Sequence, residues 1–208
     1  MSTEMSTESG TGTSTNDAAA IEARLAEAQQ DFQKARENLV EARRGVPPQE
    51  VEDYSLLAAD GQSAPLSSLF GGMDQLILVH NMGTSCAYCT LWADNFNGAL
   101  RHIQSRAGFA VVSPDAPAVQ QKFAAGRGWK FPMFSAKGSP FSKNLGFETG
   151  DTNMPFVPGV SVFQKDDGGR ITRVAKDFFG PGDLYCNVWH FFDLLPGGAN
   201  GWQPQFSY

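Results

Sequence analysis

Hydrophobic and polar positions change their spacing along the 208-residue chain, and each spacing predicts a different element. Between residues 18 and 44, apolar or small residues recur in alternating steps of four and three, which predicts one amphipathic helix with a heptad stripe. The stripe consists of Ile21, Leu25, Ala28, Phe32, Ala35, Leu39 and Ala42. Asp17 is the predicted N-cap, and Gly45 ends the helix. We expect this helix either to pack against the rest of the chain or to pair with a second copy.

Downstream, short apolar runs alternate with helical stretches. The predicted strands are 54–57, 76–80, 109–113, 131–135, 160–164 and 171–175, and the predicted helices are 90–101, 119–127 and 183–195. The turn sequence Asp166-Asp167-Gly168-Gly169 predicts an antiparallel hairpin between the last two strands. Helix-linked strands followed by a hairpin and a final helix predict an α/β protein with a mixed central sheet flanked by helices. This is the topology of the thioredoxin-like fold, here with an N-terminal helical extension.

Composition divides the chain into three parts. Residues 1–17 are rich in Ser and Thr and predict a disordered tail, residues 18–45 form the amphipathic helix, and residues 50–208 form the folded domain. The net charge of −6 argues against nucleic acid as a partner. No apolar run is long enough to cross a membrane, and the N-terminus has no secretory pattern, so we expect a cytoplasmic protein.

The segment Cys86-Ala87-Tyr88-Cys89 follows an apolar strand and opens a helix, an arrangement typical of thiol redox sites. Cys86 is the predicted nucleophile, because the N-terminus of a helix stabilises a thiolate. Cys89 lies one turn further on and is the predicted resolving thiol, so that the two cysteines would form a redox-active disulfide. Two cysteines at this spacing can also be half of a zinc site.

Val157 and Pro158 precede the strand at residues 160–164. Thioredoxin-like proteins carry a cis proline at this place, and a cis bond before proline costs only about 0.5–1 kcal/mol. We therefore expect Pro158 to be cis and to shape a substrate groove with Val157, Tyr88 and Ser85.

Three further residues are possible accessories of the cysteine pair. His80 ends a strand just before the motif and could stabilise a thiolate, but a histidine that caps the strand end is the simpler interpretation. Cys186 and His190 lie one turn apart on the predicted last helix. With Cys86 and Cys89 they could make a zinc site of three cysteines and a histidine, but a small core cysteine and a hydrogen-bonded histidine are the simpler interpretation.

Several segments resemble a bacterial thioredoxin-like family catalogued as domain of unknown function 899. They are residues 80–98, which contain the two cysteines, and residues 128–132, 158–163 and 189–196. The resemblance covers roughly residues 21–208 and implies a thioredoxin-like or peroxiredoxin-like fold. Residues 60–79 are also similar to the opening segment of peroxiredoxins. Peroxiredoxins place Thr or Ser three residues before the peroxidatic cysteine, whereas Gly83 stands there before Cys86.

The sequence thus predicts an oxidoreductase that exchanges thiols and disulfides through Cys86 and Cys89. Its expected partners are a protein or small-molecule thiol or disulfide as substrate, and a reductase or low-molecular-weight thiol as electron donor. We expect no organic cofactor and no metal. A peroxiredoxin-like thiol peroxidase and a non-catalytic zinc-binding or interaction module are the alternatives, and a homodimer through residues 18–44 remains open.

Overall fold

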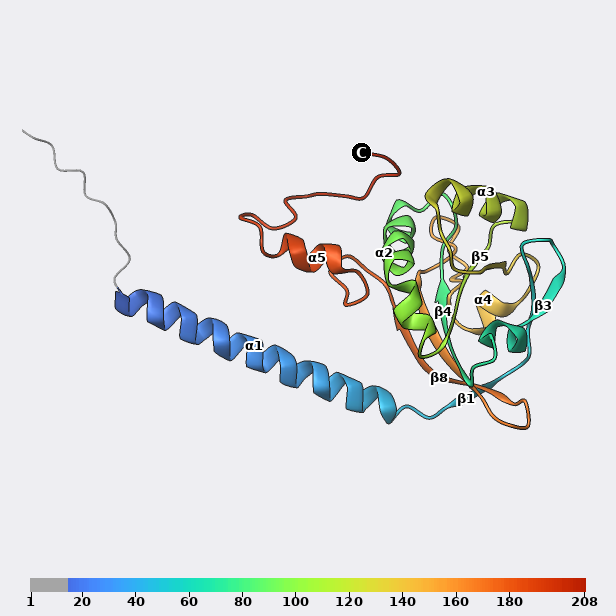
Figure 1. Ribbon diagram of the computed structural model, residues 1–208, viewed down its shortest axis with the longest axis horizontal. Helices are drawn as coiled ribbons and strands as arrows, with labels where there is room; N and C mark the ends of the chain where they lie inside the picture. Colours follow the sequence, from blue (N-terminus) through green and yellow to red (C-terminus); the bar gives the residue numbers. More distant parts are fainter. Residues whose placement is uncertain (1–14) are drawn as a thin grey trace, which may run out of the picture. The chain divides into compact units, whose positions relative to one another are not determined.

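The computed structural model describes residues 15–208, which belong to two separate units that divide between Val46 and Pro47. The predicted tail of residues 1–17 lies outside the described residues, except for its last three. The first unit contains one helix, α1 (Thr15–Arg44), shown in blue in Figure 1. The helix begins two residues before Asp17, so Asp17 lies in the first turn rather than at the N-cap. A carboxylate there still interacts favourably with the helix dipole.

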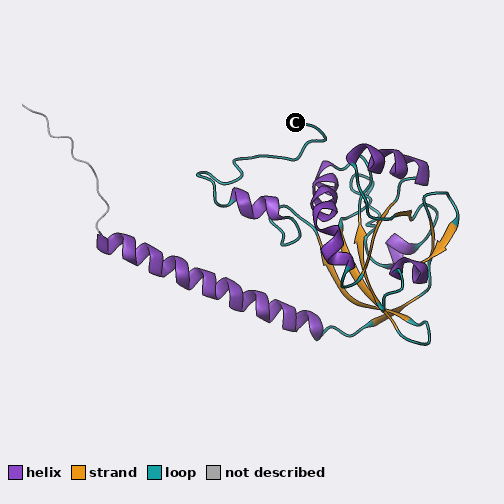
Figure 2. Cartoon of the chain, in the orientation of Figure 1, coloured by secondary structure: helices purple, strands orange, loops and turns teal. Residues whose placement is uncertain are grey.

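The second unit is built on an eight-stranded sheet in the order β1-β8-β7-β4-β5-β6-β2-β3. Its strands are β1 (Gln49–Val51), β2 (Ser55–Leu57), β3 (Ser63–Pro65), β4 (Gln75–His80), β5 (Gly108–Ser113), β6 (Met133–Ser135), β7 (Gly159–Lys165) and β8 (Ile171–Phe178). Its helices are the 3₁₀ helix η1 (Leu66–Phe70), α2 (Ala87–Gln104), α3 (Pro117–Arg127), α4 (Phe141–Asn144) and α5 (Asn187–Phe192). Strands β4, β5 and β6 are parallel, and the β7–β8 hairpin joins β4 antiparallel. The predicted mixed sheet flanked by helices is confirmed (Figure 2).

Alternation along the central strands separates two hydrophobic clusters, one on each face of the sheet. In β4, Leu76 and Leu78 belong to the first cluster, with η1 and α4, whereas Val79 belongs to the second. The second cluster also contains buried residues of α2 and α5, including Trp92 and Trp189. Successive side chains of a strand point to opposite faces, so a single apolar run supplies both cores.

Two features of the second unit differ from the predictions. Helix α5 spans only six residues, whereas residues 183–195 were expected to be helical. The three-residue strands β1 and β3 were not predicted. Within residues 15–208, no helix combines the length and apolarity needed to span a membrane.

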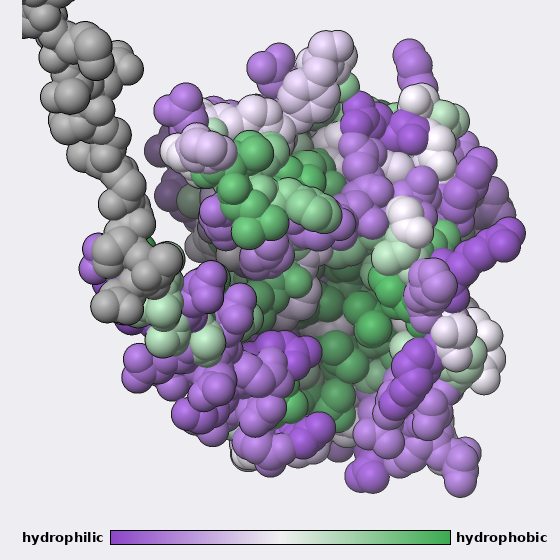
Figure 3. Space-filling model, turned by 60° about the vertical axis from the view of Figure 1, so that its left-hand side comes forward, coloured by the Kyte–Doolittle hydropathy of each residue, from purple (hydrophilic) through white to green (hydrophobic). Residues whose placement is uncertain are grey.

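Hydrophobic patches interrupt the hydrophilic surface on the face shown in Figure 3. The C-terminal part of the second unit contributes to the exposed apolar area, with Leu194 80% exposed and Phe191 63% exposed. Clustered apolar side chains on a surface are candidate contact areas for other molecules.

Candidate redox site

A short loop leads from the end of β4 into α2, and two side chains hold it. The Asn81 side-chain oxygen accepts a hydrogen bond from the Gly83 N–H at 2.8 Å. Asp115, from the loop after β5, accepts one from the Thr84 N–H at 2.7 Å. Gly83 has a φ of 110°, and a Cβ there would lie 2.9 Å from a carboxylate oxygen of Asp115. The loop therefore needs glycine at this position, and its conformation delivers Cys86 to the start of α2.

Cys86 is the N-cap residue of α2, with extended backbone angles, and its thiol is half-buried. Its Sγ accepts a hydrogen bond from the Cys89 N–H at 3.0 Å. Hydrogen bonds from the Cys89 side chain and from backbone N–H groups lower the pKa of Cys86 to about 7, against the opposing effect of burial. Cys86 is therefore an accessible sulfur that carries substantial thiolate character at neutral pH.

Cys89 differs sharply from its neighbour, because it is only 2% exposed. Its hydrogen bond to Cys86 and its burial raise the pKa of the Cys89 thiol well above the usual range. The proton is held on the buried sulfur and the negative charge on the accessible one. The two cysteines are brought together as the spacing predicts, both as free thiols.

The position of Pro158 follows from strand register. Gly159 pairs with His80 across β7 and β4, so Pro158 lies opposite Asn81, where the loop to Cys86 begins. His80 packs on the first cluster, and alternation turns the next position, Pro158, toward the face that carries the cysteines. No peptide bond within residues 15–208 is cis, so the expectation of a cis Pro158 is wrong.

The other predicted groove residues are divided between the two faces. Tyr88 is half-buried and its ring stacks on Trp189 at 6.2 Å between centroids, which makes it a wall beside Cys86. Ser85 is exposed in the loop next to the nucleophile. The Val157 side chain packs against the first cluster, on the opposite face of the sheet from Cys89.

His80 does not reach the cysteines. Its ring stacks on Phe147 at 3.6 Å between centroids, and its Nε2 lies 2.9 Å from the Ser161 hydroxyl. Burial lowers the pKa of His80 well below its ordinary value. The strand alternation that directs Val79 toward the cysteine side directs His80 away from it, so His80 is a buried core histidine rather than a partner of the thiolate.

Cys186 and His190 do not form a joint site either. Cys186 precedes α5 and is completely buried, and burial raises the pKa of its thiol, whereas His190 is exposed. His190 lines a separate cavity together with Asp94 and His102. Among the described residues, no three His, Cys, Asp or Glu side chains come together as metal ligands, so the four-ligand zinc arrangement is not formed.

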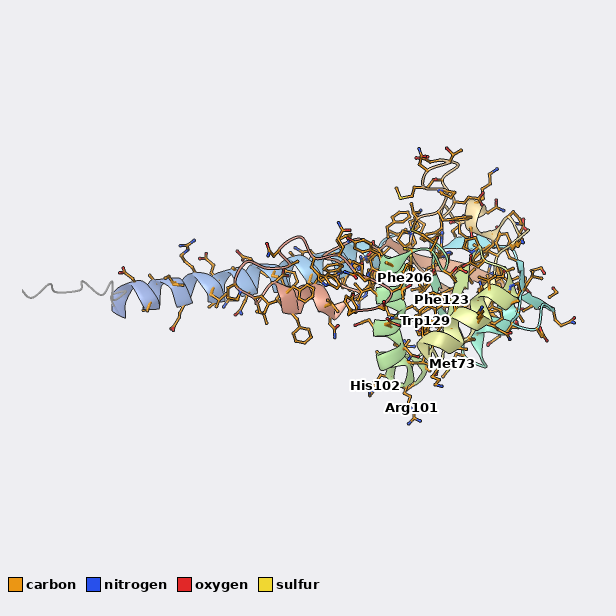
Figure 4. The ribbon with its side chains drawn as sticks, turned by 90° about the horizontal axis from the view of Figure 1, so that it is seen from above. Met73, Arg101, His102, Phe123, Trp129 and Phe206 are labelled. Atoms are coloured by element: carbon orange, nitrogen blue, oxygen red, sulfur yellow. The ribbon has the colours of Figure 1, made fainter. Side chains whose placement is uncertain are left out.

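A cavity of about 660 Å³ lies beside the loop that carries Cys86, because Thr84 forms part of its wall. Helix α3 supplies most of the lining, including Val119, Lys122 and Phe123, and the C-terminal segment adds Phe206. Phe206 contacts Phe123 edge-on, and Figure 4 shows these two rings close to Trp129. Sequence reasoning missed this cavity, because it joins parts of the chain that are far apart in sequence.

Arg127 also lines the cavity, but its charge is already paired. It forms an ion pair with Asp94 and donates a hydrogen bond to the Phe206 carbonyl oxygen at 2.6 Å. Lys122 has no ion-pair partner within residues 15–208. The cavity thus combines an apolar lining with one cation that is available to a ligand.

Fold and site together define a thioredoxin-fold protein with a cysteine pair at the start of a helix. Reduced Prx3 from Vibrio vulnificus, solved in complex with hydrogen peroxide, is 15% identical, with a TM-score of 0.51 over 67% of this chain and 91% of that one. A peroxiredoxin-like protein from Aquifex aeolicus is 16% identical, with a TM-score of 0.50 over 63% and 74% of the two chains. At these identities the likeness establishes the fold alone.

The chain belongs to the family described as bacterial protein of unknown function (DUF899), which matches residues 7–206. The family resemblance drawn from the cysteine segment is thereby confirmed. No curated protein matches the chain.

Proposed function

We propose that this protein is a thiol–disulfide oxidoreductase in which Cys86 attacks and Cys89 resolves. One observation carries the proposal: the half-buried Cys86 sulfur accepts the Cys89 N–H at the start of α2 and has a pKa of about 7. A thiol with a pKa near ambient pH combines a high thiolate fraction with good nucleophilicity. The buried Cys89, which keeps its proton, suits the second step.

The proposed reaction reduces a substrate disulfide. The Cys86 thiolate attacks one substrate sulfur and forms a mixed disulfide, while the other half of the substrate leaves as a thiolate. Cys89 then passes its proton to that thiolate and attacks the Cys86 sulfur, which releases the second half of the substrate as a thiolate. The substrate gains two electrons and leaves as one thiol and one thiolate, the thiolate takes a proton from water, and the protein is left with a Cys86–Cys89 disulfide. A reductase or a low-molecular-weight thiol would return the pair to the dithiol.

The cavity beside the loop suggests which substrates fit this site. An apolar wall containing Phe123 and the available charge of Lys122 favour a disulfide with an apolar body and a negative group. Pro158, Tyr88 and Ser85 would form the groove on the other sides of Cys86, where the substrate backbone or body docks.

A redox titration tests the proposal. The protein is equilibrated across a series of glutathione ratios, and the state of its thiols is read by mass-shift alkylation. We expect a reversible two-electron transition between about −120 and −270 mV that is unchanged in Cys186→Ser. Cys89→Ser should accumulate the mixed disulfide, and Cys86→Ser should form neither species. A pair that forms no reversible disulfide at any ratio would refute the proposed exchange.

A thiol peroxidase is the second candidate, since the accessible Cys86 thiolate could also attack a peroxide. That attack would convert Cys86 to a sulfenic acid and release an alcohol or water, and Cys89 would then form the disulfide and release water. Rapid consumption of hydrogen peroxide by the reduced protein would favour this candidate. Slow consumption together with fast disulfide exchange would favour the oxidoreductase.

A further inference from the structure

The apolar stripe of α1 is open to solvent along its length. Ile21 and Leu25 are each 58% exposed, Phe32 is 57% exposed and Leu39 is 41% exposed. Most helices in proteins gain their stability from packing an amphipathic face rather than from helix propensity. We therefore expect this 30-residue helix to be stabilised by a partner surface that covers its four large apolar side chains.

The sizes of the stripe residues indicate which partner fits. In heptad terms, Leu25, Phe32 and Leu39 occupy a positions, whereas the d positions are Ile21, Ala28, Ala35 and Ala42. In a parallel pair, each position faces the same position of the second helix. Layers of two Phe or two Leu would then alternate with layers of two Ala, and the distance between the helices could not be uniform. An antiparallel pair places a opposite d. Leu25 then faces Ala35, and Phe32 faces Ala28, so each of these layers holds one large and one small side chain.

The flanking charges differ between the two directions. In the antiparallel register, where Leu25 faces Ala35, Glu22 lies beside Arg36 of the second copy, and two-fold symmetry repeats this attractive contact. The two Asp31 side chains meet near the two-fold axis. In a parallel pair, Glu22 would instead lie beside the like-charged Asp17 of the second copy, whereas Asp31 would lie beside Arg36.

We propose that α1 is a dimerisation element that pairs antiparallel with α1 of a second copy of this chain. Leu25 and Phe32 pack against Ala35 and Ala28 of the second copy, and Leu39 packs against Ile21 near the two ends. The fit of large against small side chains sets the direction, and the Glu22–Arg36 contacts are consistent with it. The proposal involves no residue of the cysteine site and stands or falls separately from the exchange activity.

Sedimentation velocity of the full-length chain over a concentration series gives the first test. We expect a concentration-dependent species of twice the 22.5 kDa chain mass. Phe32→Asp should leave only the monomer, and redox titration of the same variant should give an unchanged potential. A chain that stays monomeric throughout, or a dimer that survives Phe32→Asp, overturns the proposal. The second result would direct attention to the exposed patch around Phe191 and Leu194.

Charge reversal tests the direction of the pair. Glu22→Arg and Arg36→Glu should each weaken the dimer roughly tenfold, because attractive contacts become repulsive twice in the symmetric pair. The double variant restores opposite charges, and its dissociation constant should return close to that of the parent. Glu37→Arg, on the outward face, is the control and should have little effect. A dimer that Glu22→Arg tightens would be parallel, and the proposed antiparallel pairing would be wrong.

Discussion

Cys86 and Cys89 carry the same side chain, yet their different positions at the start of α2 shift their pKa values in opposite directions. The pKa of Cys86 is lowered and that of Cys89 is raised. The N-cap sulfur is partly exposed and receives N–H groups that have no partner within the helix. The sulfur one turn further on is buried, keeps its proton and donates a hydrogen bond to the first sulfur. This asymmetry is what the proposed roles require, with Cys86 as the attacking thiol and Cys89 as the resolving thiol.

The pH dependence of Cys86 alkylation follows from its pKa. Because hydrogen bonds lower this pKa to about 7, the rate with iodoacetamide should rise as pH passes through 7 and level off above it. Cys89→Ala removes the leading cause, so the midpoint should move up toward the ordinary cysteine value of about 8.5. Mass spectrometry of quenched samples measures both profiles. An unchanged midpoint in the variant would show that the Cys89 side chain does not stabilise the thiolate.

Gly83 should tolerate no side chain. A Cβ at φ 110° would come within 2.9 Å of the Asp115 carboxylate that holds the loop. We expect Gly83→Ala to lower the free energy of unfolding by about 1–3 kcal/mol and to slow exchange, because the loop before Cys86 must shift. Gly98→Ala is the matched control. Gly98 lies in α2 with open space around it, so alanine there should stabilise the protein by about 0.5–1 kcal/mol. Urea unfolding distinguishes the two, and equal effects would contradict the clash.

The placement of Cys86 and Cys89 at the start of α2 could be predicted from sequence, because the strand, the loop and the helix start are contiguous in the chain. The long-range partner that holds the loop before Cys86 could not be predicted in this way. Asp115 acts on Thr84 from 31 residues away, and no local pattern connects them. The sequence left the role of His80 open, because its nearness in sequence suggested contact with Cys86, whereas strand alternation turns it to the other face.

At the scale of elements, local hydrogen bonds explain why α5 is shorter than its apolar periodicity suggests. The Asp183 carboxylate accepts hydrogen bonds from the Gly180 and Tyr185 N–H groups at 3.0 and 2.8 Å, which forms a turn where the helix was expected. Aspartate side chains commonly compete with helices in this way. Strand β1 was not predicted, because its three residues are a strand only through their pairing with β8.

Helix α3 should influence substrate choice through Lys122. We expect Lys122→Glu to raise the KM for an anionic aromatic disulfide, dithiobis(nitrobenzoate), about fivefold, with kcat unchanged. A partly exposed charge contributes on the order of 1 kcal/mol to such binding. The KM for the uncharged dipyridyl disulfide should not change. Lys130→Glu, an exposed lysine that does not line the cavity, is the control. If both variants raised the KM equally, the effect would come from the overall surface charge rather than from binding in the cavity.

At the scale of the whole molecule, the proposed association and the proposed chemistry belong to different units. Within residues 15–208, neither hydrophobic cluster draws on a residue before Val51. The cysteine site, its loop and the cavity all lie in the second unit. The exposed stripe of α1 belongs entirely to the first. A change in the association of α1 should therefore leave the surroundings of Cys86 and Cys89 unaltered.

A chain that begins at Pro47 should therefore keep the redox chemistry and lose the association. We expect its thermal unfolding midpoint and its Cys86–Cys89 potential to match those of the full chain when both are measured as monomers, because no core contact is removed. Sedimentation should show only the monomer at concentrations where the full chain associates. The full chain carrying Phe32→Asp is the control, since it keeps α1 but cannot pair. A truncated chain that unfolds at a lower temperature than this control would show that α1 stabilises the second unit directly, and the division between the units would fail.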